Sequence, residues 1–345
     1  MTTPHWPSNC RDLADLQHGM ISRRQALEAG IGPMTVKSLL HTGRWVPVHR
    51  GVYLTHTGQP DREATFWAAL LRAGRDAVLS HFTAAEVVGL IPPPGSRLGR
   101  PDGGPPDGRA ARMIHLSVPR DQHVRPIAGV ILHRRTAITQ LRQPVALPPR
   151  TRVEETTLDL ALGSATLDDA FGWLARACGN RLTTPVRLET ALAARPRVHW
   201  RSQLTGALAD IAGGAHSLLE LKYLRGVERP HGLPAGTRQQ KSAHGRRTQY
   251  RDVVYEQFGV CVETDGSMAH PLDARRLDRE RDNAAAVGGL ITLRYGWPEV
   301  TQRPCAVAAE VAAVLQANGW AGGPVPCGPG CAIGRVREAG RPTGR

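Results

Sequence analysis

The sequence predicts an α/β protein, α+β overall, built from several units. Short helical segments followed by a strand hairpin near the N-terminus, and alternating strands and helices after about residue 207, carry this prediction. At roughly 150 residues per domain, 345 residues correspond to about two domains with linkers. We expect a compact helical unit with a hairpin (1–56), a middle helical and β region (57–200), a mixed sheet flanked by helices (201–320) and a disordered Gly-, Pro- and Arg-rich tail (321–345).

The first unit begins with two short helices. Residues 11–17 fit a helical stretch with Leu13 and Leu16 on its inward side. Ser22 and Gln25 then have the spacing of a capping box, in which both side chains satisfy backbone N–H groups at a helix start. A second helix is therefore expected to begin after Ser22.

A third helix follows and carries exposed basic side chains. Pro33 lies in its first turn, where a missing N–H costs nothing. The spacing places Val36 and Leu39 inward, with Lys37 and His41 one turn apart on the outer face. This helix therefore presents its polar side to a partner.

Two short strands complete the unit, at residues 45–48 and 51–54, with a turn between them. Three short helices and a hairpin in this order are the plan of a winged helix-turn-helix domain. In the region that follows, the apolar spacing predicts helices at 61–73, 83–90, 153–162, 167–178 and 184–194, and strands at 114–118 and 129–132.

The chain is strongly basic. It has 44 Lys and Arg against 30 Asp and Glu, a formal net charge of +14. Such an excess predicts a polyanionic partner, with nucleic acid first and an anionic membrane surface second. The alternative is a composition bias, because all but three of the basic residues are arginine.

Other features of composition favour a cytoplasmic protein. The chain has no apolar stretch of the ~20 residues that a spanning helix needs, and its first residues lack a signal-peptide pattern. Six scattered cysteines fit a reducing compartment. Cys327 and Cys331 form a C-x3-C, but no second pair accompanies them, so the spacing does not predict a zinc site. We expect no membrane partner.

Acidic side chains gather in the predicted C-terminal sheet. Asp252 lies in one predicted strand, and Glu263 and Asp265 end the next. Residues two apart in a strand point to the same face, so Glu263 and Asp265 project together, and Asp252 lies beside them if the strands pair. Glu220, on the preceding helix, can add a fourth carboxylate, or instead serve a capping box with Ser217.

This acidic group has the chemistry of a metal site. Close carboxylates repel unless a cation or a shared proton offsets their charge. Mg²⁺ (or Mn²⁺) prefers such oxygen ligands, and a bound metal can generate hydroxide for phosphate hydrolysis. His270, Arg275 and Arg279 follow, and basic residues around an acidic cluster suit a phosphate-backbone substrate. The alternative is a set of solvated strand-end acids.

The run E-T-D-G at 263–266, followed by D-R-E-R-D at 278–282, resembles the DUF559 family. That family is related to the very-short-patch-repair endonucleases of the PD-(D/E)xK superfamily, and the resemblance covers roughly residues 205–315. It implies a restriction-endonuclease-like fold. It also implies Asp252 as the central metal ligand, Glu263 as the second acidic position and Glu220 as the helix-borne acid.

Two positions, 265 and 269, depart from the nuclease pattern. Asp265 stands where a nuclease of the superfamily more often carries Lys, a departure that the DUF559 pattern shares. His270 matches the histidine that closes D-G-x-x-W-H in relatives, where it implies a general acid or a water-positioning group. The tryptophan of that motif is Ala269 here.

The runs G-R-W at 43–45 and H-R-G-V-Y at 49–53 resemble the winged-helix domain of AbiEi-type antitoxins of type IV toxin–antitoxin systems. The resemblance implies that the third helix reads DNA through Lys37 and His41. Arg44 lies beyond its end, and Arg50 on the wing is placed to contact phosphate. The alternative is a winged helix used only for protein contact.

Together these resemblances predict a DNA-binding protein whose C-terminal domain is a Mg²⁺-dependent endonuclease. One alternative is a non-catalytic transcriptional regulator or antitoxin with a degenerate nuclease fold, which binds operator DNA and has a cognate toxin or a second copy as partner. Another is a basic protein that binds nucleic acid without sequence preference, with steep salt dependence.

Overall fold

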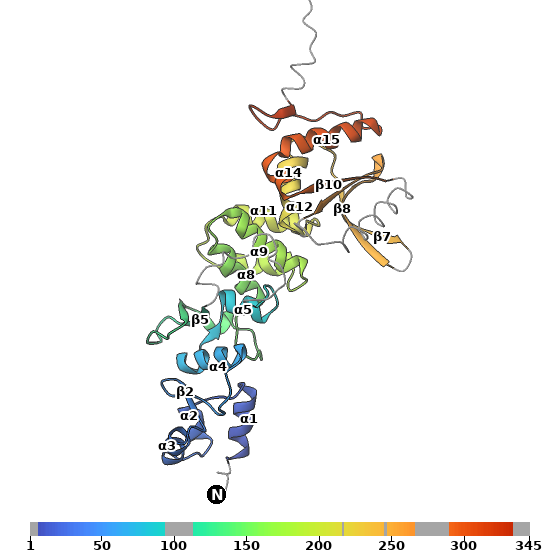
Figure 1. Ribbon diagram of the computed structural model, residues 1–345. Helices are drawn as coiled ribbons and strands as arrows, with labels where there is room; N and C mark the ends of the chain where they lie inside the picture. The colour runs from blue at the N-terminus through green and yellow to red at the C-terminus, as the bar shows by residue number, and fades with distance from the viewer. Residues whose placement is uncertain (1–5, 94–112, 216, 245–246, 266–289, 334–345) are drawn as a thin grey trace, which may run out of the picture. The chain divides into compact units, whose positions relative to one another are not determined.

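A computed structural model describes residues 6–93, 113–215, 217–244, 247–265 and 290–333 (Figure 1). The side chains of residues 240–250 and 265 are not among those described. The chain divides into two compact units, the first ending at Leu160 and the second continuing from Ala161. Both units combine helices with strands, which confirms the predicted α+β class.

The first unit contains two small sheets and the helices around them. Its elements are α1 (Ser8–Leu16), β1 (Met20–Ser22), α2 (Arg23–Glu28), α3 (Pro33–His41), β2 (Val46–His49), β3 (Val52–Leu54), α4 (Arg62–Ala73), β4 (Val78–Leu79), α5 (His81–Val87), β5 (Ile114–Pro119), β6 (Val130–Arg135), α7 (Ile138–Leu141) and α8 (Val153–Leu162), in which the division between the units falls.

The first three helices and three strands form the winged helix. Its sheet has the order β1-β3-β2, with antiparallel pairs. The predicted capping box is confirmed, because Ser22 Oγ accepts from the Gln25 N–H at 3.2 Å and Gln25 Oε1 accepts from the Ser22 N–H at 2.9 Å. Trp45 is fully buried between the rings of Trp6 and Tyr53, at centroid distances of 5.1 and 5.8 Å. This aromatic contact belongs to a core that also holds α3.

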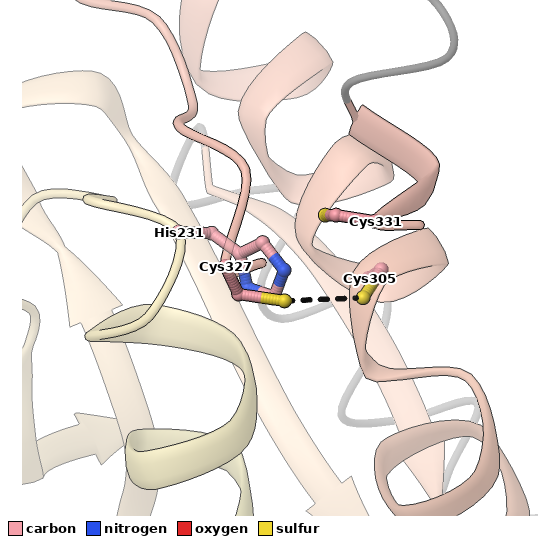
Figure 2. A group of neighbouring side chains, drawn as sticks. All are labelled: His231, Cys305, Cys327 and Cys331. Atoms are coloured by element: carbon pink, nitrogen blue, oxygen red, sulfur yellow. Dashed lines mark hydrogen bonds between the residues drawn. The ribbon is translucent and has the colours of Figure 1, made fainter. Parts of the chain in front are cut away.

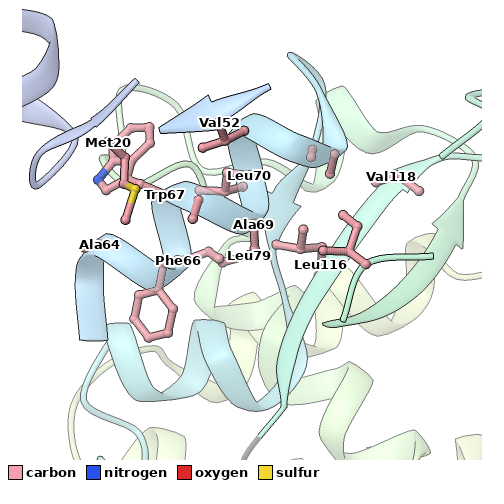
Figure 3. Close-up of a cluster of buried hydrophobic side chains, with 14 of the residues drawn as sticks. Met20, Val52, Ala64, Phe66, Trp67, Ala69, Leu70, Leu79, Leu116 and Val118 are labelled. Carbon is pink, nitrogen blue, oxygen red and sulfur yellow. The ribbon is translucent and has the colours of Figure 1, made fainter. Parts of the chain in front are cut away.

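Helix α4 supplies the main core of the first unit. Phe66, Trp67 and Leu70 on α4 are buried in one cluster with Leu116 and Val118 of β5 (Figure 3). Strand β5 is central in its sheet, whose order is β4-β5-β6, with β5 and β6 parallel. The same cluster includes side chains from β1 and β3, so the core ties the winged helix to α4.

The second unit begins with helices and continues into a mixed sheet. Its elements are α9 (Leu167–Gly179), α10 (Pro185–Ala194), α11 (Arg201–Ala212), α12 (Leu218–Lys222), the π-helix η1 (Tyr223–Glu228), β7 (Thr237–His244), β8 (Arg247–Tyr255), the 3-10 turn η2 (Glu256–Phe258), β9 (Val260–Asp265), β10 (Ile291–Gly296), α14 (Trp297–Gln302) and α15 (Pro304–Ala317).

The four-stranded sheet of this unit has the order β10-β9-β8-β7. Strand β10 runs parallel to β9, and the other neighbours are antiparallel. Val253 of β8 and Val262 of β9 are paired partners, and both are buried with apolar residues of α12, η1 and α15. The predicted mixed sheet flanked by helices is therefore present, and its strands fix the positions of the acids adjacent to Val253 and Val262.

A buried polar network ties η1 to this sheet. Glu228 Oε1 is 2.8 Å from Arg238 Nη2, with side chains only 4% and 9% exposed. Tyr255 donates its hydroxyl to Glu228 Oε2 at 3.1 Å, and the hydroxyls of Tyr255 and Tyr223 are 3.0 Å apart. Each charge in the network depends on its partners, because a buried charge left unpaired is costly.

We expect Glu228→Ala to lower the free energy of unfolding by about 3–5 kcal/mol, because it leaves the Arg238 guanidinium buried without its counter-charge. Chemical denaturation of the full chain measures this loss. Asp168→Ala is the matched control, because Asp168 pairs with Lys222 while it is 51% exposed, and its loss should cost less than about 1 kcal/mol. Equal effects of the two substitutions would contradict the prediction.

Part of the predicted disordered tail packs onto the second unit. Cys331 and Ile333 are buried in its core cluster, and the Val325 N–H donates to the His231 carbonyl at 2.8 Å. These contacts hold residues 321–333 in place, although the Gly- and Pro-rich composition predicts disorder for them. Among the described residues, no helix is both long and apolar enough to cross a membrane.

Candidate functional site

Helix α3 shows a polar outer face, as predicted. Val36 and Leu39 are buried, at 0% and 3% exposure, while Lys37 and His41 are exposed. The buried face packs with Trp45 in the aromatic core of the winged helix. Helix α3 is therefore held rigidly, and its cationic and polar side chains face away from the protein, as the recognition helix of a winged helix does.

The cations beyond α3 are exposed as well. Gly43, with a φ of +68°, ends the helix, and Arg44 follows it on the surface. Arg50 lies exposed in the turn between β2 and β3, which forms the wing. Residues 29–60 contain no Asp or Glu, so this stretch adds no acidic side chain to the surface. A cationic stretch of this kind attracts polyanions.

A groove lies beside this surface, between the end of α3 and helix α1. Arg11 and Arg44 line it together with His18, His56 and one acidic residue, Asp15. Trp6 and Leu39 add apolar surface to its lining. The groove extends the set of cations near α3 to a residue that sequence reasoning did not select, Arg11.

In the second unit, Asp252 is held where the predicted acidic group was expected. It precedes Val253 on β8, and its Oδ2 accepts hydrogen bonds from the N–H and the hydroxyl of Thr264 on β9, at 2.7 and 3.1 Å. Burial, together with the negative charge of Glu220, raises the pKa of Asp252 to about 6. The charge of Glu263 also raises this pKa, while the Thr264 hydrogen bonds lower it.

The other two described acids have partners of their own. Glu220 is 5% exposed and its Oε2 accepts from Gln239 Nε2 at 3.1 Å. Its backbone N–H donates to Ser217 Oγ, so the backbone of Glu220 takes part in the helix cap. The charge of its side chain raises the pKa of Asp252. Glu263 forms an ion pair with Arg294 at 3.1 Å. The structure therefore brings Glu220, Asp252 and Glu263 into one electrostatic group.

The remaining predicted residues of this site are not described. The backbone of Asp265 ends β9, where it pairs with Gly296, but its side chain is outside the described set. His270, Arg275 and Arg279 also lie outside the described residues. Their proposed roles stay predictions.

The donor chemistry of the three acids fits a hard divalent cation. Carboxylate oxygens are the ligands that Mg²⁺ prefers, and a cation would offset both the burial of the Asp252 carboxylate and the negative charge of Glu220, which raise its pKa. Among the described residues, the oxygens of these three acids are not all within 4.8 Å of one another. Fewer than three of them would therefore hold one ion, with water or phosphate oxygens completing its shell, as is usual for Mg²⁺.

Comparison with known proteins bears on the first unit. Residues 11–56 match a family of transcriptional regulators, the AbiEi antitoxins. This span begins in α1 and ends after β3, so it coincides with the winged helix, including α3. The N-terminal resemblance is thereby confirmed. The AbiEi match does not reach residues 205–315, where the resemblance to DUF559 stays a prediction. The search of curated proteins found no match.

A cluster of three histidines in the first unit was not predicted. The His81 and His133 rings stack at a centroid distance of 3.6 Å and an interplanar angle of 13°, and His115 Nδ1 is 3.0 Å from His133 Nε2. Stacked rings keep their in-plane lone pairs in parallel planes, so these nitrogens are not aimed at one ion. No local sequence signal joins the three positions, because they come from α5, β5 and β6.

We expect this cluster to make the first unit sensitive to acid. Burial is the main cause that lowers the pKa of His81 to about 3 and that of His133 to about 4. Repulsion from the neighbouring histidines and from Arg135 lowers both further, while the charge of Asp159 raises both. Above the unfolded-state pKa of about 6.5 both states are neutral, so the full stability is present. Below it the unfolded chain binds protons first, so stability is lost as the pH falls towards 4.

We expect the Tm of the first unit to fall by about 5 °C or more between pH 7.5 and pH 5. Thermal melts followed by circular dichroism test this, and His133→Asn should reduce the drop. His123→Gln is the control, because His123 is exposed in the same unit and should leave the drop unchanged. A pH profile that is the same in His133→Asn and in the wild type would contradict the assignment.

Proposed function

We propose that this chain is a transcriptional regulator that binds duplex DNA through its winged helix. The observation that carries the proposal is the coincidence of the AbiEi match over residues 11–56 with a folded winged helix that exposes Lys37 and His41 on α3. In this proposal α3 enters the major groove, and the wing with Arg50 contacts the phosphate backbone.

The charge distribution supports DNA as the partner. Arg44 and Arg50 extend the cationic surface beyond α3, and residues 29–60 contribute no acidic residue to it. Phosphate contacts of this kind supply sequence-independent affinity, while side chains on the helix read base edges. An antitoxin role adds a protein partner to the proposal, either a cognate toxin or a second copy of the chain, in a cytoplasmic setting.

A genomic selection tests this function. The full chain is mixed with sheared DNA from its source organism at physiological salt, and the bound fragments are recovered and sequenced. We expect enrichment of a few sites that share a sequence. Uniform recovery of all fragments would favour the non-specific binder instead, and recovery of none would overturn the proposal.

A second function rests on a different observation in the second unit. We propose that the acids around Asp252 support metal-dependent hydrolysis of DNA phosphodiester bonds, because Thr264 holds the Asp252 carboxylate in a partly buried position where burial first, and the charges of Glu220 and Glu263 in addition, raise its pKa. Asp252 and Glu263 would hold Mg²⁺ or Mn²⁺, and Glu220 would add negative charge beside them. The bound metal would supply Lewis-acid stabilisation and activation of water. Asp265 and His270 would assist, with Arg275 and Arg279 at the phosphate backbone.

The residues of this chain would have distinct tasks in that reaction. Thr264 on β9 orients the Asp252 carboxylate through two hydrogen bonds to one oxygen, Oδ2, and leaves Oδ1 for the metal. Arg294 holds Glu263 near the end of β9 and limits its movement. At neutral pH Asp252 is mostly ionised, because its pKa of about 6 lies below the solution pH.

A further inference from the structure

Four side chains of the types that bind zinc converge in the second unit, and none of them belongs to the acidic group around Asp252. They are His231, Cys305, Cys327 and Cys331 (Figure 2), and one ligand atom from each lies within 4.8 Å of the others. His231 comes from the loop after η1, Cys305 from the first turn of α15, and the other two cysteines from the C-terminal segment. We propose that these residues form a structural zinc site of the Cys3His type.

The distance between the sulfurs fits a shared metal ion. Cys305 Sγ and Cys327 Sγ are 3.6 Å apart. Two thiolates bound tetrahedrally at Zn–S distances of about 2.3 Å are about 3.8 Å apart, whereas a disulfide bond is about 2.05 Å long. Both cysteines are free thiols in this structure. Their separation therefore corresponds to two ligands of one tetrahedral ion.

The histidine is oriented as a metal ligand. His231 is completely buried, and its Nδ1 lies 2.8 Å from the Val227 carbonyl, which can only accept a hydrogen bond. Nδ1 therefore carries the proton, and Nε2 presents its lone pair. Nε2 is buried and has no hydrogen-bond partner among the described residues. A ring that donates one N–H to a backbone carbonyl and leaves the other nitrogen for the ion is the usual arrangement of a zinc-bound histidine.

The position of Cys305 favours negative charge. It is the second residue of α15, a helix of 14 residues, where unpaired backbone N–H groups and the helix dipole stabilise anions. On zinc binding the three thiols release their protons to solvent and bind as thiolates, while His231 binds as the neutral imidazole. The completed site has four protein ligands and no open position, which is the pattern of structural zinc.

The proposed site explains how the C-terminal segment is held. Residues 321–327 form no helix or strand, yet the Val325 N–H bonds to the His231 carbonyl, and Cys331 packs in the core. A zinc ion would join this segment to η1 and α15 by bonds that its Gly- and Pro-rich composition cannot replace by packing. The metal would thereby cross-link the C-terminal segment to the rest of the second unit.

Metal analysis of the full chain tests the proposal. The chain is purified without chelator or affinity metal, and its zinc is measured by mass spectrometry of the elements. We expect one zinc per chain in the wild type, and loss of most of it in Cys327→Ser. Cys327 is exposed and outside the buried core cluster, so the sheet and helices of the second unit should fold in this variant even if the C-terminal segment is released. Cys178→Ser is the matched control, because Cys178 lies on α9 outside the cluster, and it should keep its zinc.

Two further measurements report on the cysteines directly. The Co²⁺ spectrum reports how many thiolates bind the metal, and the intact mass reports whether the cysteines are oxidised. Co²⁺ bound to the wild type should show tetrahedral d–d bands and thiolate charge-transfer bands, and the charge-transfer intensity should fall by about one third in Cys327→Ser if one of three thiolates is lost. Metal-free wild type, or unchanged zinc in both Cys327→Ser and His231→Gln, would overturn the proposal. So would an oxidised mass that reveals a Cys305–Cys327 disulfide in freshly purified, unreduced protein.

Discussion

The double variant Lys37→Ala/Arg44→Ala is expected to bind the selected DNA site about 100-fold more weakly than the wild type. Each cation contributes about 1–2 kcal/mol through a base or phosphate contact, and about 2.8 kcal/mol corresponds to a factor of 100. Both side chains are exposed, so their removal should leave the fold intact. Fluorescence anisotropy with a labelled duplex at fixed salt measures the affinity.

The matched control removes the same charge elsewhere in the first unit. Arg75 and Arg125 are both exposed and lie outside the winged helix. Arg75→Ala/Arg125→Ala should weaken binding only by the small, general effect of net charge. If this control and Lys37→Ala/Arg44→Ala lose affinity equally, or if neither loses any, α3 is not the DNA-reading element.

The second large effect is expected at Asp252. Asp252→Asn should reduce metal-dependent cutting of DNA by about 1000-fold, because the neutral amide is a poor ligand for Mg²⁺ and several kcal/mol of transition-state stabilisation are lost. Nicking of supercoiled plasmid, with Mg²⁺, Mn²⁺ or EDTA, measures the rate. Asp168→Asn is the control, because it removes an exposed carboxylate of the same unit.

The same variant has a second readout that does not require activity. A carboxyl whose folded pKa is raised to about 6 destabilises the fold as the pH rises from about 4 through 6, because ionisation is harder in the native state. Asp252→Asn can keep an oxygen acceptor for the Thr264 donors, so it should raise Tm by about 2–4 °C at pH 8, and by less at pH 4. A lower Tm at pH 8 would contradict the described surroundings of Asp252.

These two readouts separate the site from the reaction. If the wild type never cuts DNA but Asp252→Asn gains stability at pH 8, the acidic group exists and the hydrolase function fails. In that case the regulator remains as the single proposed function. If cutting persists in Asp252→Asn, the catalytic assignment fails even though the chain is a nuclease.

The sequence predicts much of the winged helix because its signals are local. The capping box of Ser22 and Gln25 and the proline at the start of α3 are adjacent patterns with direct physical meaning. The predicted inward position of Leu16 is wrong, because it is 51% exposed. Helix α1 begins at Ser8, before the predicted start, and buries Cys10 and Ala14 instead.

Other elements depend on contacts that no local pattern encodes. Strand β1 has only three residues, Met20–Ser22, and exists because it pairs with β3. The helix predicted after Ser217 continues as the π-helix η1, whose apolar pattern does not differ visibly from that of an α-helix. The secondary structure of such segments is determined by their tertiary contacts and not by the spacing of their residues.

The two ligand-rich clusters show the same limit. Cys327 and Cys331 gave a weak signal in the sequence because their partners were missing, and folding brings His231 and Cys305 to them from other elements. The carboxylates were easier to predict, because strand alternation and a short turn place Asp252 beside the end of β9. Proximity across a hairpin can be read from sequence, whereas proximity across a whole unit cannot.

Chemical footprinting of the selected DNA site tests the central claim most directly. Dimethyl sulfate methylates guanine N7 in the major groove, so a recognition helix seated there protects those bases. The account predicts protection by the wild type and by Arg75→Ala/Arg125→Ala, and its loss with Lys37→Ala/Arg44→Ala at protein concentrations adjusted for equal occupancy. Unprotected guanines in the wild-type complex, or full protection by Lys37→Ala/Arg44→Ala, would contradict it.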